Sequence, residues 1–157
     1  MHRKILVMGL PGAGKTTLAS ALAMRLHAVH FNADEVRKHI HKDLGFGHAD
    51  RVEHAYRMGW LCDQVARSGC FAIADFVCPT HETRQAFLTH GPAFVVWVDR
   101  IQESRFEDTN RLFLPPDRYD MRVPCEGLAE HWANQVAEHM LLPLEINRGK
   151  APLPSDR

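Results

Sequence analysis

Short apolar runs alternate with longer, helix-prone stretches along most of the chain. The apolar runs lie at 4–8, 28–31, 70–77 and 93–98, and an alternating one lies at 119–123. Runs of this length are typical of strands buried in a parallel sheet. The stretches that favour helices lie at 17–26, from 32, from 50, at 80–89 and at 126–141. This order predicts an α/β domain of three layers, with a five-stranded, mainly parallel sheet and helices on both faces.

Polar residues mark where the predicted helices begin. Asn32 or Asp34 is suited to cap the second helix, and Thr80 the fourth. We expect the third helix to start near Asp50, with Glu53 as its capping-box partner. The last helix should end before Pro143, so residues 1–142 form one domain and residues 143–157 a partly disordered tail.

A glycine-rich segment joins the first strand to the first helix. Residues 9–16 read Gly-Leu-Pro-Gly-Ala-Gly-Lys-Thr and fit the phosphate-binding pattern G-x-x-x-x-G-K-[ST]. The strand before it and the helix after it are the context that this motif requires, which makes a plain glycine-rich turn the less favoured interpretation. We therefore expect a P-loop NTPase fold with ATP bound by this set: Gly9, Leu10, Pro11, Gly12, Ala13, Gly14, Lys15, Thr16 and Thr17.

The chemistry of the motif assigns roles to its last residues. Lys15 should reach the β- and γ-phosphates, and Thr16 should place its hydroxyl on Mg²⁺. Asp34 and Asp75 follow the second and third strands, where ligands bind in parallel α/β sheets. Either acid is suited to hold Mg²⁺ or its waters, and either is equally suited to cap a chain segment.

Arginines, acids and prolines dominate residues 99–118. Mobile arginines of such a segment can close over a nucleotide and neutralise charge on a transferring phosphoryl group. Arg105 and Arg111 are the candidates for this lid. An ordinary charged surface loop is an equally good interpretation.

Composition limits the remaining classes of function. Hydrophobic residues make up 45 % of the chain and 19 basic residues balance 19 acidic ones, so no overall positive field attracts nucleic acid. No apolar run reaches the roughly 18 residues of a membrane span. Residues 1–4 lead straight into the first strand, which leaves no room for a signal peptide and predicts a cytoplasmic protein.

Four ordered blocks give the chain a resemblance to the adenylylsulfate kinase group of P-loop kinases. After the phosphate loop, residues 32–37 (NADEVR) resemble that family's D-G-D-N-V-R. Residues 43–47 with 50–54 resemble D-L-G-F-S and D-R-x-E-N, and residues 76–79 resemble F-I-S-P. The resemblance covers residues 6 to about 99 and implies an ATP–Mg²⁺ phosphotransferase with an alcohol acceptor.

The resemblance also implies an acceptor site. Asp34 matches the acid that faces the acceptor hydroxyl, which makes it, with Lys15, a candidate catalytic residue. Arg37, Phe46 and Arg51 match substrate-site residues, and His54 stands where the family has a substrate-binding Asn. The family's C-terminal lid block, with K-G-L-Y and F-T-G-I-D, is absent from this sequence.

These departures leave the acceptor open. The reduced scaffold is similar to phage kinases that phosphorylate 5-hydroxymethyluracil in DNA during thymidine hypermodification, and this acceptor is our first expectation, in a host cytoplasm. Phosphorylation of the 3′-hydroxyl of adenylylsulfate is the alternative. A nucleotide-binding sensor without chemistry is the rival of another class.

Overall fold

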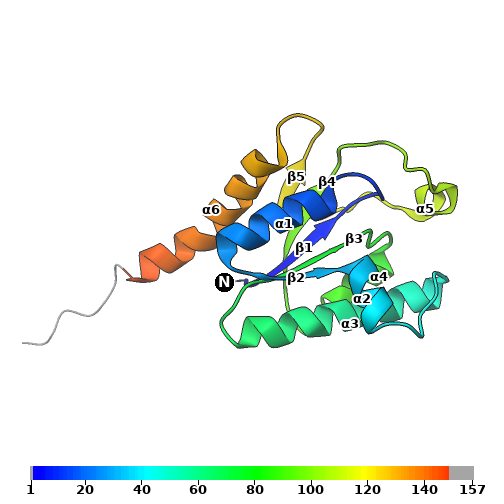
Figure 1. Cartoon of the computed structure of the whole chain (residues 1–157), viewed down its shortest axis with the longest axis horizontal. Helices are drawn as coiled ribbons and strands as arrows, with labels where there is room; N and C mark the ends of the chain where they lie inside the picture. The colour runs from blue at the N-terminus through cyan, green and yellow to red at the C-terminus, as the bar shows by residue number, and fades with distance from the viewer. Residues whose placement is uncertain (1, 149–157) are drawn as a thin grey trace, which may run out of the picture.

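The structure is a computed structural model that describes residues 2–148 (Figure 1). Side chains are described for residues 2–142. Five parallel strands form one sheet in the order β2-β3-β1-β4-β5. The strands are β1 (Lys4–Met8), β2 (Val29–Asn32), β3 (Ala72–Phe76), β4 (Phe94–Val98) and β5 (Met121–Val123). The predicted α/β fold with a five-stranded parallel sheet is therefore confirmed.

Within residues 2–148 there are six helices, of which the longer ones cover the two faces of the sheet. They are α1 (Lys15–Leu26), α2 (Ala33–His39), α3 (His48–Arg67), α4 (His81–Phe87), α5 (Glu107–Leu112) and α6 (Ala129–Arg148). Helices α1 and α6 lie side by side on one face, and α3 and α4 pack together on the other (Figure 1). None of the helices within residues 2–148 has the length and apolar character needed to cross a membrane.

The side-chain alternation of β1 explains why this strand lies in the centre. Ile5 and Val7 pack in the core beneath α1 and α6, whereas Leu6 and Met8 pack in the core beneath α3 and α4. Successive side chains of a strand point to opposite faces, so a central strand needs apolar residues at every position. The apolar run at 4–8 is the sequence signature of this double burial.

Helices α3 and α4 touch through a glycine. A Cβ atom placed on Gly59 would lie 2.2 Å from the carbonyl oxygen of Phe87. The two helices therefore pack closer than any side chain at this position allows. The buried Lys4 ammonium joins the same contact, donating to Asp63 at 3.1 Å and to the Phe87 carbonyl at 2.6 Å.

The start of α3 and the end of α6 are the helix boundaries that depart in kind from the sequence expectations. Helix α3 begins at His48 with Gly47 as its cap residue, and the predicted Asp50–Glu53 capping box is wrong because Asp50 accepts from the Gly45 backbone N–H instead. Helix α6 runs from Ala129 to Arg148 rather than ending at 141. The proline at 143 removes one backbone donor without ending the helix. The rest of the predicted tail, 149–157, lies outside the described residues.

The two predicted cap residues of α2 and α4 are confirmed. The side chain of Asn32 accepts from the backbone N–H of Glu35 at 3.1 Å, which leaves Asp34 free of any capping role. Thr80 caps α4 in a capping box with Thr83. These caps fix where each helix starts beyond the carboxyl end of its strand.

Candidate active site

The phosphate-binding motif lies between β1 and α1, as its sequence context predicts. Gly14 is the residue before α1 and has φ 95°, a left-handed conformation that favours glycine. A Cβ on Gly9 would lie 2.5 Å from the Val98 carbonyl oxygen of β4, so the loop passes close against the neighbouring strand. The loop thereby directs the N-terminus of α1, with its free N–H groups, toward the cleft.

Lys15 is the first residue of α1 and is almost fully buried. Its ammonium donates to the carbonyl oxygen of Leu10 at 2.8 Å, across the loop to which it belongs. Burial lowers the pKa of Lys15 to about 8, against the opposing pull of the Asp75 and Asp34 carboxylates. The pKa of the Lys15 amine therefore lies close to neutral pH.

Asp75 is the centre of a polar network at the carboxyl ends of the strands. The Thr16 hydroxyl donates to it at 3.1 Å and the Asn32 amide at 3.2 Å, and His30 pairs with its second oxygen. The parallel register explains the meeting, because Val7, Asn32 and Asp75 are aligned on β1, β2 and β3. Sequence reasoning found Thr16 and Asp75 but missed Asn32 and His30 as their partners.

One cleft of about 1260 Å³ contains both halves of the expected site. Its walls include the phosphate loop from Pro11 to Thr17 except Ala13, with Asp75 beneath it. The other predicted residues that line the cleft are Asp34, Arg37, Phe46, Arg51, His54 and Arg105. Val77–Pro79, which sequence reasoning had not assigned to the site, also line the cleft, as does most of 101–109 from the predicted lid segment. The volume exceeds that of an ordinary small-molecule pocket, so two ligands have room side by side.

Phe46 forms an exposed aromatic platform at one end of the cleft. The guanidinium of Arg37 lies 4.3 Å from its ring centre and that of Arg51 lies 5.6 Å from it. Arg37 donates to the Gly45 carbonyl and Arg51 to the Phe46 carbonyl, both at 2.8 Å. Phe46 as a whole residue is 66 % exposed, so part of its ring is accessible for a base to stack on.

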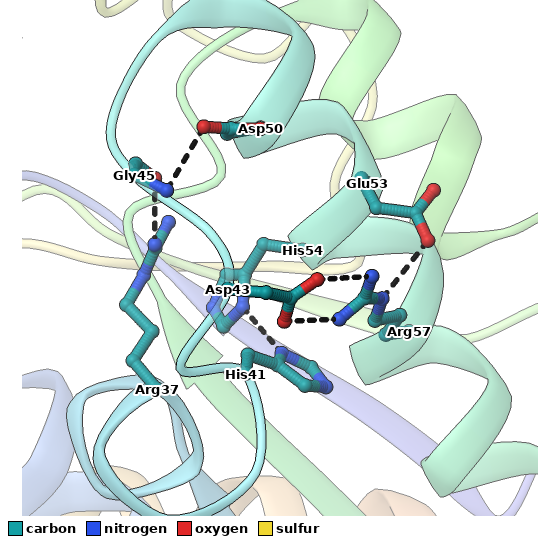
Figure 2. A network of polar contacts seen from close by, with 8 residues as sticks. All are labelled: Arg37, His41, Asp43, Gly45, Asp50, Glu53, His54 and Arg57. Carbon is teal, nitrogen blue, oxygen red and sulfur yellow. Dashed lines mark hydrogen bonds and ion pairs between the residues drawn. The ribbon is translucent and has the colours of Figure 1, made fainter.

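His54 is buried in α3, on the side that faces the loop after α2. Its Nδ1 lies 2.8 Å from Nδ1 of His41 (Figure 2). Burial, reinforced by the nearby Arg37 guanidinium, lowers the pKa of His54 to about 3, so its ring is neutral. Sequence reasoning missed His41 as a partner, because only the folding of the loop after α2 onto α3 brings it there.

Three charged residues hold that loop against α3. Arg57 donates two hydrogen bonds to the Asp43 carboxylate, each of 2.9 Å, and one to Glu53 at 2.9 Å (Figure 2). A bidentate arginine–carboxylate pair restricts geometry more than a single contact does. The loop between α2 and α3 is thus fixed at both His41 and Asp43.

The two lid candidates lie in different places. Arg105 lines the cleft and stacks on Phe106, with 4.9 Å between its guanidinium and the ring centre. Arg111 lies on α5, where it pairs with Glu107 one turn away, and it is not among the cleft-lining residues. The sequence pattern gave no means to separate them, because the direction of each side chain depends on where α5 begins.

The family model for adenylylsulphate kinase matches residues 2–111, well over half of the chain. The chain belongs to the adenylylsulphate kinase family. Members of this family are ATP-dependent kinases whose acceptor is an alcohol. The match includes the phosphate loop, both acids and the whole loop between α2 and α3.

Curated relatives agree with this assignment over part of their length. The adenylyl-sulfate kinase of Synechococcus sp. (strain JA-3-3Ab) is 39 % identical over 82 residues, which cover 49 % of this chain and 47 % of that protein. The adenylyl-sulfate kinase of Chloroflexus aurantiacus is 38 % identical over 89 residues, covering 54 % and 48 %. The chain matches about half the length of these relatives.

The likeness in fold extends further than the likeness in sequence. The structure of the Mycobacterium tuberculosis APS kinase CysC in complex with AMPPNP and APS superimposes with a TM-score of 0.78. The superposition covers 88 % of this chain and 97 % of that one at 20 % identity. The shared architecture therefore continues past residue 111, where the family match ends.

Proposed function

We propose that this protein transfers the γ-phosphoryl group of ATP to an alcohol of a nucleotide-type acceptor, with the 3′-hydroxyl of adenylylsulfate as the first acceptor. One observation carries the proposal: Lys15, Asp34 and the Phe46 platform line a single cleft. A phosphate-binding loop at one end and a stacking surface at the other fit two nucleotides, with an acid between them.

The donor half of the cleft has the groups that phosphoryl transfer needs. The N–H groups of the loop and the Lys15 ammonium would hold the phosphates of ATP and stabilise the charge that builds up on the transferring group. The Thr16 hydroxyl and the Asp75 carboxylate are hard oxygen donors 3.1 Å apart, which fit Mg²⁺ and its water shell. Bound there, Mg²⁺ would supply charge neutralisation between the β- and γ-phosphates.

Asp34 is the acid of the acceptor half. It stands in the first turn of α2, exposed to the cleft, with no capping role to occupy it. A carboxylate in this place can accept a hydrogen bond from the acceptor hydroxyl, orient it in line with the γ-phosphate and take its proton. A sensor that binds nucleotide without chemistry has no need of such an acid.

The named relatives favour adenylylsulfate as the acceptor over our first expectation from sequence. Both curated relatives given above are adenylyl-sulfate kinases, and the family model spans the acceptor-side residues of this chain. The hydroxymethyl group of 5-hydroxymethyluracil in DNA is the second candidate. The neutral His41–His54 pair where the family has an asparagine is the observation that favours a changed acceptor.

The deciding experiment offers the purified protein γ-labelled ATP with each acceptor in turn. The acceptors are adenylylsulfate, 5-hydroxymethyl-deoxyuridine monophosphate, and single-stranded DNA that contains 5-hydroxymethyluracil. The control is the same DNA with thymine in place of 5-hydroxymethyluracil. We expect labelled product from adenylylsulfate and none from this control DNA. Labelling of the modified DNA alone would transfer the proposal to the second candidate, and ATP binding without transfer to any of them would support the sensor.

A further inference from the structure

Two buried histidines from different elements meet behind the acceptor end of the cleft. His41 lies in the loop after α2 and is 3 % exposed, and His54 lies in α3 and is 2 % exposed. Their Nδ1 atoms are 2.8 Å apart, and the rings are nearly perpendicular at 87°. Figure 2 shows the two imidazoles next to the Asp43–Arg57 ion pair.

This contact ties the proton positions of the two rings to each other. Two ring nitrogens approach to 2.8 Å only when one carries a proton and the other a lone pair. Because both rings are neutral, the one that donates from Nδ1 has its lone pair at Nε2. The one that accepts at Nδ1 carries its proton on Nε2. The pair thus has two arrangements, which differ in whether His54 offers a donor or an acceptor at Nε2.

The Nε2 atom of His54 is the end of this pair that matters for a ligand. It is buried and has no hydrogen-bond partner among the residues that the structure describes, while the ring belongs to the lining of the cleft. Buried polar atoms are nearly always paired, so an unpaired one beside a ligand cleft indicates a partner supplied by the ligand.

The charges around His54 favour one arrangement. The groups that act on His54 are the cations Arg37, Arg51 and Arg57, besides His41, and the Phe76 ring lies at its edge. These cations attract an electron-rich group of a ligand into this part of the cleft. An N–H at Nε2 of His54 is complementary to such a group, whereas a lone pair at Nε2 would repel it. Burial lowers the pKa of His41 and keeps its ring neutral, with the cations Arg57 and Arg37 acting in the same direction and the Asp43 and Glu53 carboxylates in the opposite one.

We propose that His41 is a positioning residue that sets the tautomer of His54. By donating its own Nδ1–H it holds the proton of His54 on Nε2. His54 then presents a hydrogen-bond donor to an oxygen or an unprotonated ring nitrogen of the nucleotide-type acceptor. This inference rests on the proposed function for the identity of the ligand. A donor at Nε2 of His54 would favour acceptors that have a lone pair at that point over acceptors that have an amino group there.

The surroundings of His41 are built to keep the donor in place. Its backbone N–H donates to the Val36 carbonyl at 2.9 Å, which anchors it to α2. Two residues later Asp43 is gripped by Arg57. Glu53, His54 and Arg57 lie within about one turn of α3. The same helix therefore carries both the ring that accepts from His41 and the arginine that binds Asp43.

The first test reads the tautomers directly in the free protein. Nitrogen-15 NMR of the imidazole side chains separates protonated from unprotonated ring nitrogens. We expect His41 protonated at Nδ1 and His54 at Nε2 at pH 7. The acceptor should shift His54 Nε2 while a non-hydrolysable ATP analogue alone leaves it unchanged. A proton on Nδ1 of His54, or two rings that both carry a charge, would refute the assignment.

The second test separates positioning from structural support by kinetics. His41→Phe should raise the KM for the acceptor about tenfold, the value of one lost neutral hydrogen bond, with the KM for ATP unchanged. His54→Gln replaces the ring by an amide, which has a donor but no tautomers. In this background, adding His41→Phe should therefore raise the KM for the acceptor less than twofold. His39→Ala is the matched control, because His39 is exposed and pairs only with Glu35 on its own helix.

The outcomes distinguish this inference from the proposed function. If His41→Phe has the same effect in the His54→Gln background as alone, His41 supports the loop and does not set a tautomer. If the wild-type protein transfers phosphate to no acceptor, the proposed function fails, and the NMR tautomers still decide the His41–His54 assignment by themselves.

Discussion

The hydroxyl of Thr16 donates a 3.1 Å hydrogen bond to Asp75, from the start of α1 to the end of β3. The two residues are 59 positions apart in sequence and meet only because β1 and β3 are parallel neighbours. This contact puts a hydroxyl and a carboxylate at the place where the phosphates of ATP would lie.

Asp75→Asn tests whether this contact serves Mg²⁺. The amide keeps the hydrogen bond from Thr16 within reach but removes the negative charge. We expect the Mg²⁺ concentration for half-maximal activity to rise about tenfold or more, as for other residues that orient metal ligands. The titration is run at saturating ATP, and Mg²⁺-free nucleotide should bind equally well to both proteins. An unchanged Mg²⁺ requirement would assign the metal to Asp34 instead.

Asp34→Asn tests the acid of the acceptor half. The variant should lose transfer by about a hundredfold or more, because the amide cannot take a proton from the alcohol. The affinity for ATP, measured by calorimetry, should stay within about twofold. Glu35→Gln is the matched control, since Glu35 is adjacent, exposed and paired with His39. Wild-type turnover by Asp34→Asn would exclude the proposed role.

The lowered pKa of Lys15 predicts how ATP binding depends on pH. With a pKa of about 8, Lys15 is charged below pH 8 and neutral above it in the free protein. Phosphate charge favours the protonated amine, so binding above pH 8 takes up a proton and affinity falls by up to about tenfold per pH unit. Calorimetry between pH 7 and 9.5 measures both quantities.

Two variants test the prediction for Lys15. Lys15→Arg keeps its charge throughout this pH range, so its affinity for ATP should no longer fall as the pH rises. Lys15→Ala should abolish turnover at every pH. A wild-type affinity that does not change between pH 7 and 9.5 would contradict the prediction.

Arg105 and Arg111 allow the lid interpretation to be tested with a matched pair. Arg105 lines the cleft, whereas Arg111 lies on the short helix α5 and is engaged by Glu107. Arg105→Ala should lower kcat about tenfold or more if its charge stabilises the transferring phosphoryl group. Arg111→Ala should change kcat less than twofold. Equal effects would mean that the segment acts as a whole and not through Arg105.

Gly59→Ala tests the packing of α3 against α4. In an exposed helix interior this substitution stabilises by up to about 1 kcal/mol. Here the new methyl group would lie 2.2 Å from a backbone oxygen of Phe87, so we expect a loss of about 2–3 kcal/mol in the free energy of unfolding. Gly47→Ala is the control, because a Cβ added there would meet no other part of the described chain within 4 Å. Urea denaturation compares the two.

Much of the fold was predictable because it depends on local patterns. The central strands β1 and β3 are apolar except for Lys4 and Asp75, and the glycine-rich motif fixes the places of β1 and α1 on either side of it. The ends of helices were less predictable, since Gly47 caps α3 without a side chain and the proline at 143 lies inside α6. In both cases the local signals for the start or end of a helix do not coincide with the observed boundary.

The residues of the site were likewise predictable only in part. Lys15, Thr16 and both acids were predictable from a motif and from the rule that parallel strands end at one edge. The His41–His54 contact was not, because neither histidine has a motif and their distance depends on how the loop between α2 and α3 folds back. His30 and Asn32 were missed as partners of Asp75 because strand order is needed to see that they are neighbours.

The way in which this loop is attached has a consequence for how the family diverges. The ATP side stands on strands of the buried core, where most substitutions would unfold the domain. The loop on the acceptor side is held to its neighbours in part by polar contacts near the surface, among them Arg57 of α3 with Asp43 and Arg37 of α2 with Gly45. Exposed contacts of this kind add little to stability. Mutations can therefore accumulate around the acceptor while the domain still folds and binds ATP, so a duplicated gene can acquire a new alcohol substrate without first losing its phosphate donor.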